Sequence, residues 1–408
     1  MAKLFFSALA YVGAAVLVAL ALLMLGAQAA PWVSGSFARG QTADDPTDIS
    51  RLELSDAREA DKGGEPPTAL AFPEPPNAKE PNASTASVAP SAAAQQTGSS
   101  SSAAAPPNTA QSGATVARIS EPYAFQPKGF SLVDAETRAA LVNIYCTLTR
   151  GGARSAYSGS GVFVDPRGII LTNAHVAQYF LLAGHNENDA HCVIRSGSPA
   201  AARWNAQLLY IPKPWVEEHA EDIRKTRSIG TGEHDYALLY VTGAADGSPL
   251  PGAFPHLAPD TREAIGFQDD PVLVAAYPAE FIGGAAAQHS LHPSSSVGTI
   301  KTLMTFGSKL IDLLSLGGTP LAQGGASGGA VVNAWGRLIG VVVTTSEGAT
   351  TGERDLRAIS LAHIDRSLRV HAGVGLAALL ALEPNAARSA YFAPIEPALS
   401  QRLREALQ

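Results

Sequence analysis

Cysteine, charged residues and aromatic residues are all scarce in this 408-residue chain. It has 2 cysteines, 16% charged and 7% aromatic residues, against 46% hydrophobic residues. The cysteines, Cys146 and Cys192, lack the paired spacing of a zinc site, so we expect no metal. The formal net charge is −7 and no long basic block occurs, which argues against nucleic acid as a partner.

Charge is absent altogether from residues 4–30, which are mostly Ala, Leu, Val and Phe. An apolar run of this length can span a bilayer as a helix, so we predict a transmembrane anchor over residues 1–31. Lys3 precedes the run and Arg39 is the first charge after it, which places the rest of the chain outside the cytoplasm. The alternative is a cleaved signal peptide, because Ala27-Gln28-Ala29 resembles a cleavage site. Either interpretation puts the remainder in the periplasm or the cell exterior.

Hydrophobic periodicity is missing from the next part of the chain. Residues 32–129 are rich in Pro, Ala and Ser, with low-complexity pieces at 65–67, 73–76 and 99–107. Such a composition cannot bury enough apolar surface to offset the entropy of the chain. We therefore predict a disordered linker that separates the anchor from a folded domain starting near Phe130.

A glycine-rich loop around Ser327 carries the main candidate for chemistry. Residues 323–332 read Gln-Gly-Gly-Ala-Ser-Gly-Gly-Ala-Val-Val. A serine hydroxyl becomes a strong nucleophile only when a base removes its proton and nearby donors hold the resulting oxyanion. Glycines let the backbone turn tightly and point its N–H groups inward. Ser327 is therefore the candidate nucleophile, and the N–H groups of Gly325 and Ser327 are the candidate oxyanion hole.

The candidate base and its orienting acid lie upstream. His175 follows a predicted hairpin with arms at residues 161–164 and 169–172, so it lies at a strand end. Asp235 precedes an apolar, strand-like run, where an aspartate can accept the ring N–H of the histidine and stabilise the imidazolium. The neighbouring His234 should point to the opposite side, so we interpret it as a bystander.

The rest of the folded region, residues 130–372, consists of short strands separated by turns. Many such strands favour an all-β barrel or sandwich. One amphipathic helix is predicted at residues 215–227, and a helical tail over 373–408 should pack against the domain. The other predicted strands are residues 140–148, 271–277, 296–303, 330–333 and 337–345, and the terminal helices are 361–370, 376–382 and 397–407.

In the order His, Asp, Ser, these motifs resemble a trypsin-like serine protease of the chymotrypsin fold. They read Thr-Asn-Ala-His-Val, His-Asp-Tyr-Ala-Leu-Leu and Gly-Gly-Ala-Ser-Gly-Gly. The resemblance implies two perpendicular six-stranded β-barrels with the triad between them. It also implies cleavage of polypeptides through an acyl-enzyme, with no metal or organic cofactor. The segment after Ser327 is most similar to the bacterial HtrA/Deg branch, which implies protein quality control or processing.

The chain departs from that branch at several points. PDZ domains usually follow the protease, but too few residues follow His371 for one, and Ala326 stands where the branch commonly has Asn. No Ile-Val-Gly-Gly activation site occurs, so zymogen cleavage of the digestive type is not expected. Gly325 to Gly329 also fits the nucleophile elbow of α/β-hydrolases, but a predicted hairpin, not a helix, follows the serine.

Three features stay open at this point. By family analogy Leu321 forms the base of the primary specificity pocket, with Thr344 beside it, which predicts cleavage after small or medium apolar residues. Cys146 and Cys192 either form a disulfide, which would stabilise the fold by roughly 4 kcal/mol, or remain small buried thiols. A catalytically silent peptide-binding module is the alternative to an active endopeptidase.

Overall fold

The computed structural model describes residues 116–119, 121–184, 188–225, 231–282, 284–307 and 309–408. The predicted anchor and most of the predicted linker lie outside these ranges. Within them, no helix is long and apolar enough to cross a membrane. All described residues belong to one structural unit, Ser100–Gln408.

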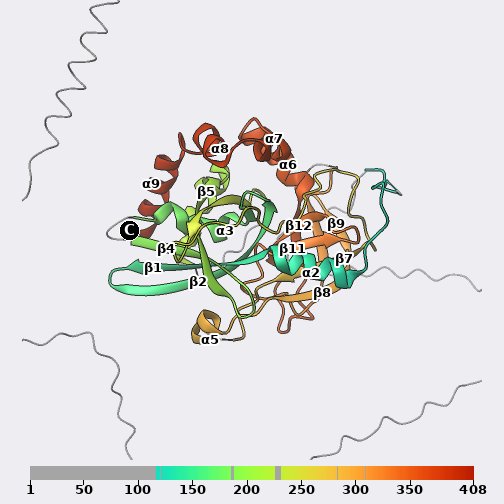
Figure 1. The fold of residues 1–408 in the computed structure, drawn as a ribbon, viewed down its shortest axis with the longest axis horizontal. Coiled ribbons are helices and arrows are strands. Elements are labelled where there is room, and N and C mark those ends of the chain that lie inside the picture. The colour runs from blue at the N-terminus through green and yellow to red at the C-terminus, as the bar shows by residue number, and fades with distance from the viewer. Residues whose placement is uncertain (1–115, 120, 185–187, 226–230, 283, 308) are drawn as a thin grey trace, which may run out of the picture. The chain divides into compact units, whose positions relative to one another are not determined.

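Six antiparallel strands close into a first barrel, drawn in green in Figure 1. They hydrogen-bond in the order β1-β2-β3-β6-β5-β4, so the barrel has no free edge. β3 is buried along its whole length, as expected of a strand whose four residues Ile-Ile-Leu-Thr are nearly all apolar. The strands are β1 (Leu141–Arg150), β2 (Ala153–Asp165), β3 (Ile169–Thr172), β4 (Asn188–Ser196), β5 (Ala201–Tyr210) and β6 (Ala237–Ala244).

The hairpin of β2 and β3 leads directly to His175. Its turn is fixed by Asp165, whose Oδ1 accepts the N–H of Arg167 at 2.9 Å and whose carbonyl accepts the N–H of Gly168 at 3.1 Å. Gly168 has φ +87°, which a residue with a Cβ rarely adopts. The Asp-Pro-Arg-Gly sequence therefore specifies the turn, and the second arm begins and ends where the sequence predicts.

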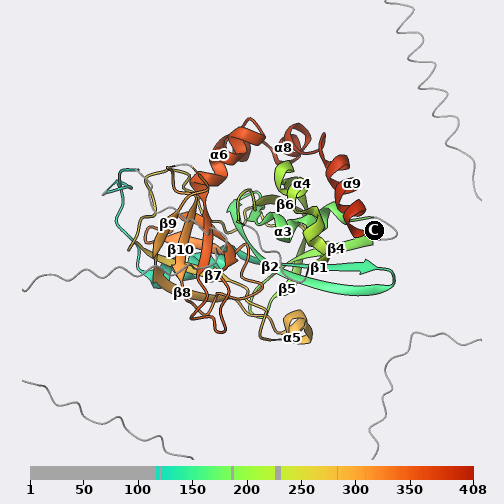
Figure 2. The same ribbon diagram turned by 180° about the vertical axis from the view of Figure 1, so that it is seen from behind.

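Seven strands form the second sheet, drawn mainly in orange in Figures 1 and 2. Its order is β8-β7-β11-β12-β13-β10-β9, so β8 and β9 are the ends of the described sheet. The second half is therefore not the closed six-stranded barrel that the resemblance implies. The strands are β7 (Pro271–Ala276), β8 (Ser294–Thr299), β9 (Thr302–Met304), β10 (Leu313–Gly317), β11 (Ala330–Asn333), β12 (Leu338–Thr345) and β13 (Leu356–Ser360).

The division of residues 296–303 into two strands explains part of this difference. The N–H of Ile300 donates to the carbonyl of Asp270, beside β7. The N–H of the next residue, Lys301, donates to the carbonyl of Ser315 in β10. The chain changes partner between these two residues, and strand propensity alone does not reveal such a change.

The chain ends in helices that begin beside the second sheet, and the last two of them pack on the first barrel. Arg388 Nε donates to the carbonyl of Leu208 in β5, and the hydroxyl of Tyr240 in β6 donates to Asn385 Oδ1. Figures 1 and 2 show the last helices in an arc along the barrel. The helices are α6 (Leu361–His371), α7 (Leu376–Ala381), α8 (Pro384–Tyr391) and α9 (Glu396–Leu407). Of these four helices, α8 alone was not predicted, because it buries a single residue, Ala387.

The end of the predicted disordered linker is instead attached to the second sheet. The hydroxyl of Tyr123 donates to Asp260 Oδ2 at 2.6 Å, and Trp335 Nε1 donates to the carbonyl of Phe125 at 3.0 Å. The N–H of Lys128 donates to the carbonyl of Ala334 at 2.8 Å. The aromatic rings of Tyr123 and Phe125 supply the apolar area that the preceding Pro/Ala/Ser sequence lacks. These contacts with the folded domain therefore lie before its first described helix, α2 (Phe130–Ala140).

Cys146 and Cys192 form a disulfide within the first barrel. They lie directly opposite each other in the antiparallel pair of β1 and β4. Of the two alternatives that the sequence leaves open, the structure therefore has the bridge. It links strands on both sides of the hairpin that leads to His175.

Candidate active site

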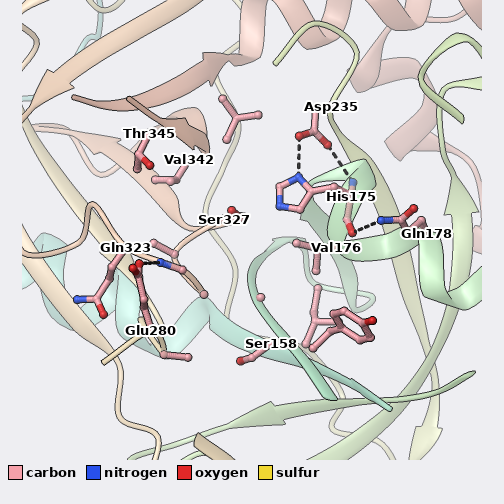
Figure 3. Close-up of a pocket in the computed structure, with 18 of the residues that line it drawn as sticks. Ser158, His175, Val176, Gln178, Asp235, Glu280, Gln323, Ser327, Val342 and Thr345 are labelled. Carbon is pink, nitrogen blue, oxygen red and sulfur yellow. Dashed lines mark hydrogen bonds and ion pairs between the residues drawn. The ribbon is translucent and has the colours of Figure 1, made fainter. Parts of the chain in front are cut away.

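A cavity of about 640 Å³ contains side chains from both sheets. Its lining includes all three predicted catalytic residues, His175, Asp235 and Ser327. Two of them come from connections of the first barrel, after β3 and before β6, and Ser327 comes from the loop before β11. The structure thus brings the three predicted residues together, and Figure 3 shows them facing one another.

His175 lies in the short helix α3 (Ala174–Ala177) and is held against Asp235. Asp235 Oδ2 lies 2.7 Å from His175 Nδ1, and Oδ1 accepts the backbone N–H of His175 at 3.0 Å. Asn173 Nδ2 donates to the carbonyl of Asp235 at 2.9 Å, which ties the two connections together. Both carboxylate oxygens are therefore engaged with the same histidine.

This pairing fixes which ring nitrogen of His175 carries the proton. A carboxylate only accepts hydrogen bonds, so Nδ1 is the donor and Nε2 of the neutral ring keeps its lone pair. Figure 3 shows Ser327 on the side of the ring away from Asp235. The free lone pair is thus on the side where a base for the hydroxyl of Ser327 is needed.

The surroundings of His175 raise its pKa above the ordinary value of 6.5. Burial by itself lowers the pKa of the imidazolium, but the charge of Asp235 and its hydrogen bond outweigh that effect. The exposed fraction of the imidazole side chain is 22%, so the ring remains open to the cavity. An imidazole with a raised pKa is a stronger base, and its cation is stabilised once formed.

His234 has a different environment. Its Nδ1 lies 2.9 Å from the hydroxyl of Ser367 in α6, and its ring packs edge-on against His371. Burial, and then the neighbouring His371 and His363, lower its pKa to about 4. With φ 60°, His234 does not follow the strand alternation assumed from the sequence. It does not line the cavity, which agrees with its interpretation as a bystander.

The loop that carries Ser327 is docked onto the first barrel by Ser160 of β2. The N–H of Ser160 donates to the carbonyl of Ser327 at 2.7 Å, and its hydroxyl donates to the carbonyl of Gly325 at 2.8 Å. Gly328 has φ +87°, and a Cβ there would lie 1.8 Å from the carbonyl oxygen of Ser160. The glycine after the serine is therefore required by close contact between the two sheets.

Sequence reasoning missed Ser160. It is fully buried, and its hydroxyl also accepts the N–H of Tyr277. A serine between two glycines, just before the apolar residues 162–164 of the strand, was the available signal. Its role depends on a partner 165 residues away in the chain, which a local pattern does not reveal.

The two backbone donors of the candidate oxyanion hole lie on the loop before β11. Among the residues that the structure describes, no acceptor pairs with the N–H of Gly325 or the N–H of Ser327. Both residues line the cavity, and Gly325 has φ +90°. A Cβ at Gly325 would come within 2.7 Å of the carbonyl oxygen of Tyr277, so glycine is required here too.

The predicted base of the specificity pocket does not line this cavity. Leu321 is 1% exposed and packs in the core of the second sheet. It lies in a tight turn, where the N–H of Gln323 donates to its carbonyl, and Gln323 faces the cavity instead. The side chain of Thr344 is outside the described ones, whereas Thr345 lines the cavity. The lining is mixed, with Glu280 and Arg354 beside apolar side chains such as that of Val342, so the apolar preference stays a prediction.

Comparison with known proteins identifies one domain. Residues 159–341 match the family model of the trypsin-like peptidase domain. The matched segment starts in β2, ends in β12 and contains His175, Asp235 and Ser327, but it covers less than half of the chain. None of the curated proteins matches this chain. The match and the two β-sheets support a peptidase of the trypsin-like type, a class whose substrates are polypeptides.

Proposed function

We propose that this chain is a serine endopeptidase that cleaves peptide bonds through an acyl-enzyme. The observation that carries the proposal is the His175–Asp235 pair facing Ser327 in one cavity of a domain that matches trypsin-like peptidases. In this role Ser327 is the nucleophile, His175 the general base and Asp235 the group that orients it.

In the proposed reaction these groups act in turn. His175 Nε2 takes the proton of the Ser327 hydroxyl as Oγ attacks the scissile carbonyl carbon. The N–H groups of Gly325 and Ser327 stabilise the oxyanion of the tetrahedral intermediate. When the C–N bond breaks, the imidazolium gives its proton to the leaving amine, and a water molecule then hydrolyses the ester by the same route.

We further propose that the domain works outside the cytoplasm, attached to the membrane by residues 4–30. Support comes from the length of that uncharged run and from the Cys146–Cys192 bridge, because disulfides persist in oxidising compartments. Within this setting, the resemblance to the HtrA/Deg branch favours quality control or processing of exported polypeptides.

A peptidase assay on the full chain in detergent tests the catalytic proposal. Wild type should hydrolyse an unstructured protein substrate, and Ser327→Ala should reduce the rate by several orders of magnitude, about 10⁶-fold at most. Ser248→Ala is the matched control, since Ser248 lies in an exposed turn away from the cavity. Equal rates for wild type and Ser327→Ala would favour the catalytically silent peptide-binding module.

A further inference from the structure

The peptide bond between Gly324 and Gly325 decides where one oxyanion donor points. The carbonyl of Gly324 accepts the backbone N–H groups of Ala279 and Glu280, at 2.8 and 3.1 Å. Because a trans peptide is planar, the N–H of Gly325 points the opposite way from this carbonyl. The segment 279–280 therefore holds the Gly325 N–H turned away from itself, in a residue that lines the cavity.

The side chain of Glu280 holds the other side of the same loop. Its Oε2 accepts the N–H of Gly324 at 2.8 Å, a contact drawn in Figure 3. Both N–H and C=O of Gly324 are thus bound to Glu280 or its neighbour. No other side chain among the described residues hydrogen-bonds to the backbone of Gly324.

Arg354 fixes the carboxylate of Glu280 in turn. Its two Nη atoms lie 3.0 and 3.3 Å from the two carboxylate oxygens. Nη1 also donates to the carbonyl of Ala322, and Nε donates to the carbonyl of Gly348. The exposed fraction of the Arg354 side chain is only 10%, so solvent screens this pair little. One guanidinium therefore joins the carboxylate to the segment just before Gly324.

A brace is needed here because two successive glycines form the peptide. Glycine populates positive and negative φ about equally, so a Gly-Gly peptide rotates easily unless other groups hold it. Rotation of this peptide by half a turn would exchange the N–H of Gly325 for the carbonyl of Gly324. A carbonyl oxygen in that place repels an oxyanion. The following residue, Ala326, has no polar side chain that could hold the loop.

We propose that Glu280 is a positioning residue for the oxyanion hole, and that Arg354 holds it in place. The inference rests on the endopeptidase function proposed above. It assigns to the Glu280–Arg354 pair a role in the rate of the chemical step, beyond that of a structural ion pair. Substrate binding in the ground state does not depend on the oxyanion donor, so the role should appear in kcat and not in KM.

The test compares Glu280→Ala and Glu280→Gln in the full chain. Loss of one oxyanion donor costs about 10²- to 10³-fold in kcat, so loss of its brace should cost about tenfold or more, with KM within about twofold. Glu280→Gln keeps an oxygen that accepts the Gly324 N–H and should recover most of that loss. Asp246→Ala is the matched control, because Asp246 also accepts a loop N–H, from Ser248, but does not line the cavity.

Each outcome has a distinct meaning. A kcat for Glu280→Ala equal to that of wild type overturns the inference, and so do equal losses in the Ala and Gln variants. If wild type itself is no faster than Ser327→Ala, the endopeptidase function fails first, and the inference with it. If Glu280→Ala does not fold, Glu280→Leu takes its place in the same comparison. Leucine keeps an apolar side chain at this position but has no oxygen to accept the Gly324 N–H.

Discussion

The two sheets contribute to the candidate site in different ways. The first barrel presents His175 and Asp235 at the ends of β3 and β6, adjacent strands of a closed barrel. The second sheet presents Ser327 and the oxyanion donors on a loop of glycines, held by side chains far away in the chain. The base is thus positioned by regular secondary structure and the nucleophile by individual hydrogen bonds. Substitutions should reveal this difference.

Among the residues that position the base or the nucleophile, Asp235 of the first barrel should be the most sensitive to substitution. Asp235→Asn puts an amide in place of the carboxylate that accepts from His175 Nδ1, so the ring takes the wrong tautomer. We expect kcat to fall by about 10⁴-fold, with the fold intact. Steady-state kinetics measure kcat, and a circular dichroism spectrum shows whether the fold is intact. A loss below about tenfold would mean that Asp235 does not orient the base.

Removal of the disulfide tests how much it contributes to the stability of the first barrel. Replacing both Cys146 and Cys192 with Ala should lower the free energy of unfolding by about 4 kcal/mol, because the unfolded chain regains loop entropy. Chemical denaturation at a temperature where both proteins fold measures the change. Wild type under reducing conditions is the control and should move toward the variant. An unchanged midpoint of unfolding would show that the bridge adds no stability.

The rate should depend on Ser160 of β2, which holds the loop that carries Ser327. Ser160→Ala removes the hydroxyl that joins Gly325 and Tyr277 but keeps the backbone hydrogen bond to Ser327. Leaving buried polar groups unpaired costs about 1–3 kcal/mol, so kcat should fall by about tenfold to a hundredfold. Ser158→Ala, in the same strand, tests whether the effect belongs to position 160. Equal losses at both positions would argue against a specific role.

The smallest expected effect is a shift in pH dependence. Activity requires neutral His175, and Asp235 raises its pKa, so kcat/KM should increase with pH and reach half its maximum above pH 6.5. In Asp235→Asn both contributions that raise the pKa are lost, so the residual activity should persist to lower pH. The pH profiles of the two proteins measure the difference. A midpoint that does not move would mean that another group controls the profile.

The difference between local patterns and remote contacts explains which site residues can be predicted from the sequence. His175, Asp235 and Ser327 were predictable because each lies in a local pattern, next to a hairpin, a strand or a glycine-rich turn. Ser160, Glu280 and Arg354 were missed because their partners are remote in the chain. The burial of Leu321 was not foreseen for a related reason: its distance from the serine does not reveal the turn that directs it into the core. Its role at the base of the specificity pocket stays a prediction.

In the proposed mechanism His175 activates Ser327 as a nucleophile. Labelling of the full chain with a fluorophosphonate, followed by mass spectrometry, tests it most directly, because the reagent reacts with an activated serine. We expect a single adduct on Ser327 that is lost in His175→Ala and kept in His234→Ala. No adduct on wild type, or an adduct on Ser327 that persists at full rate in His175→Ala, would contradict it.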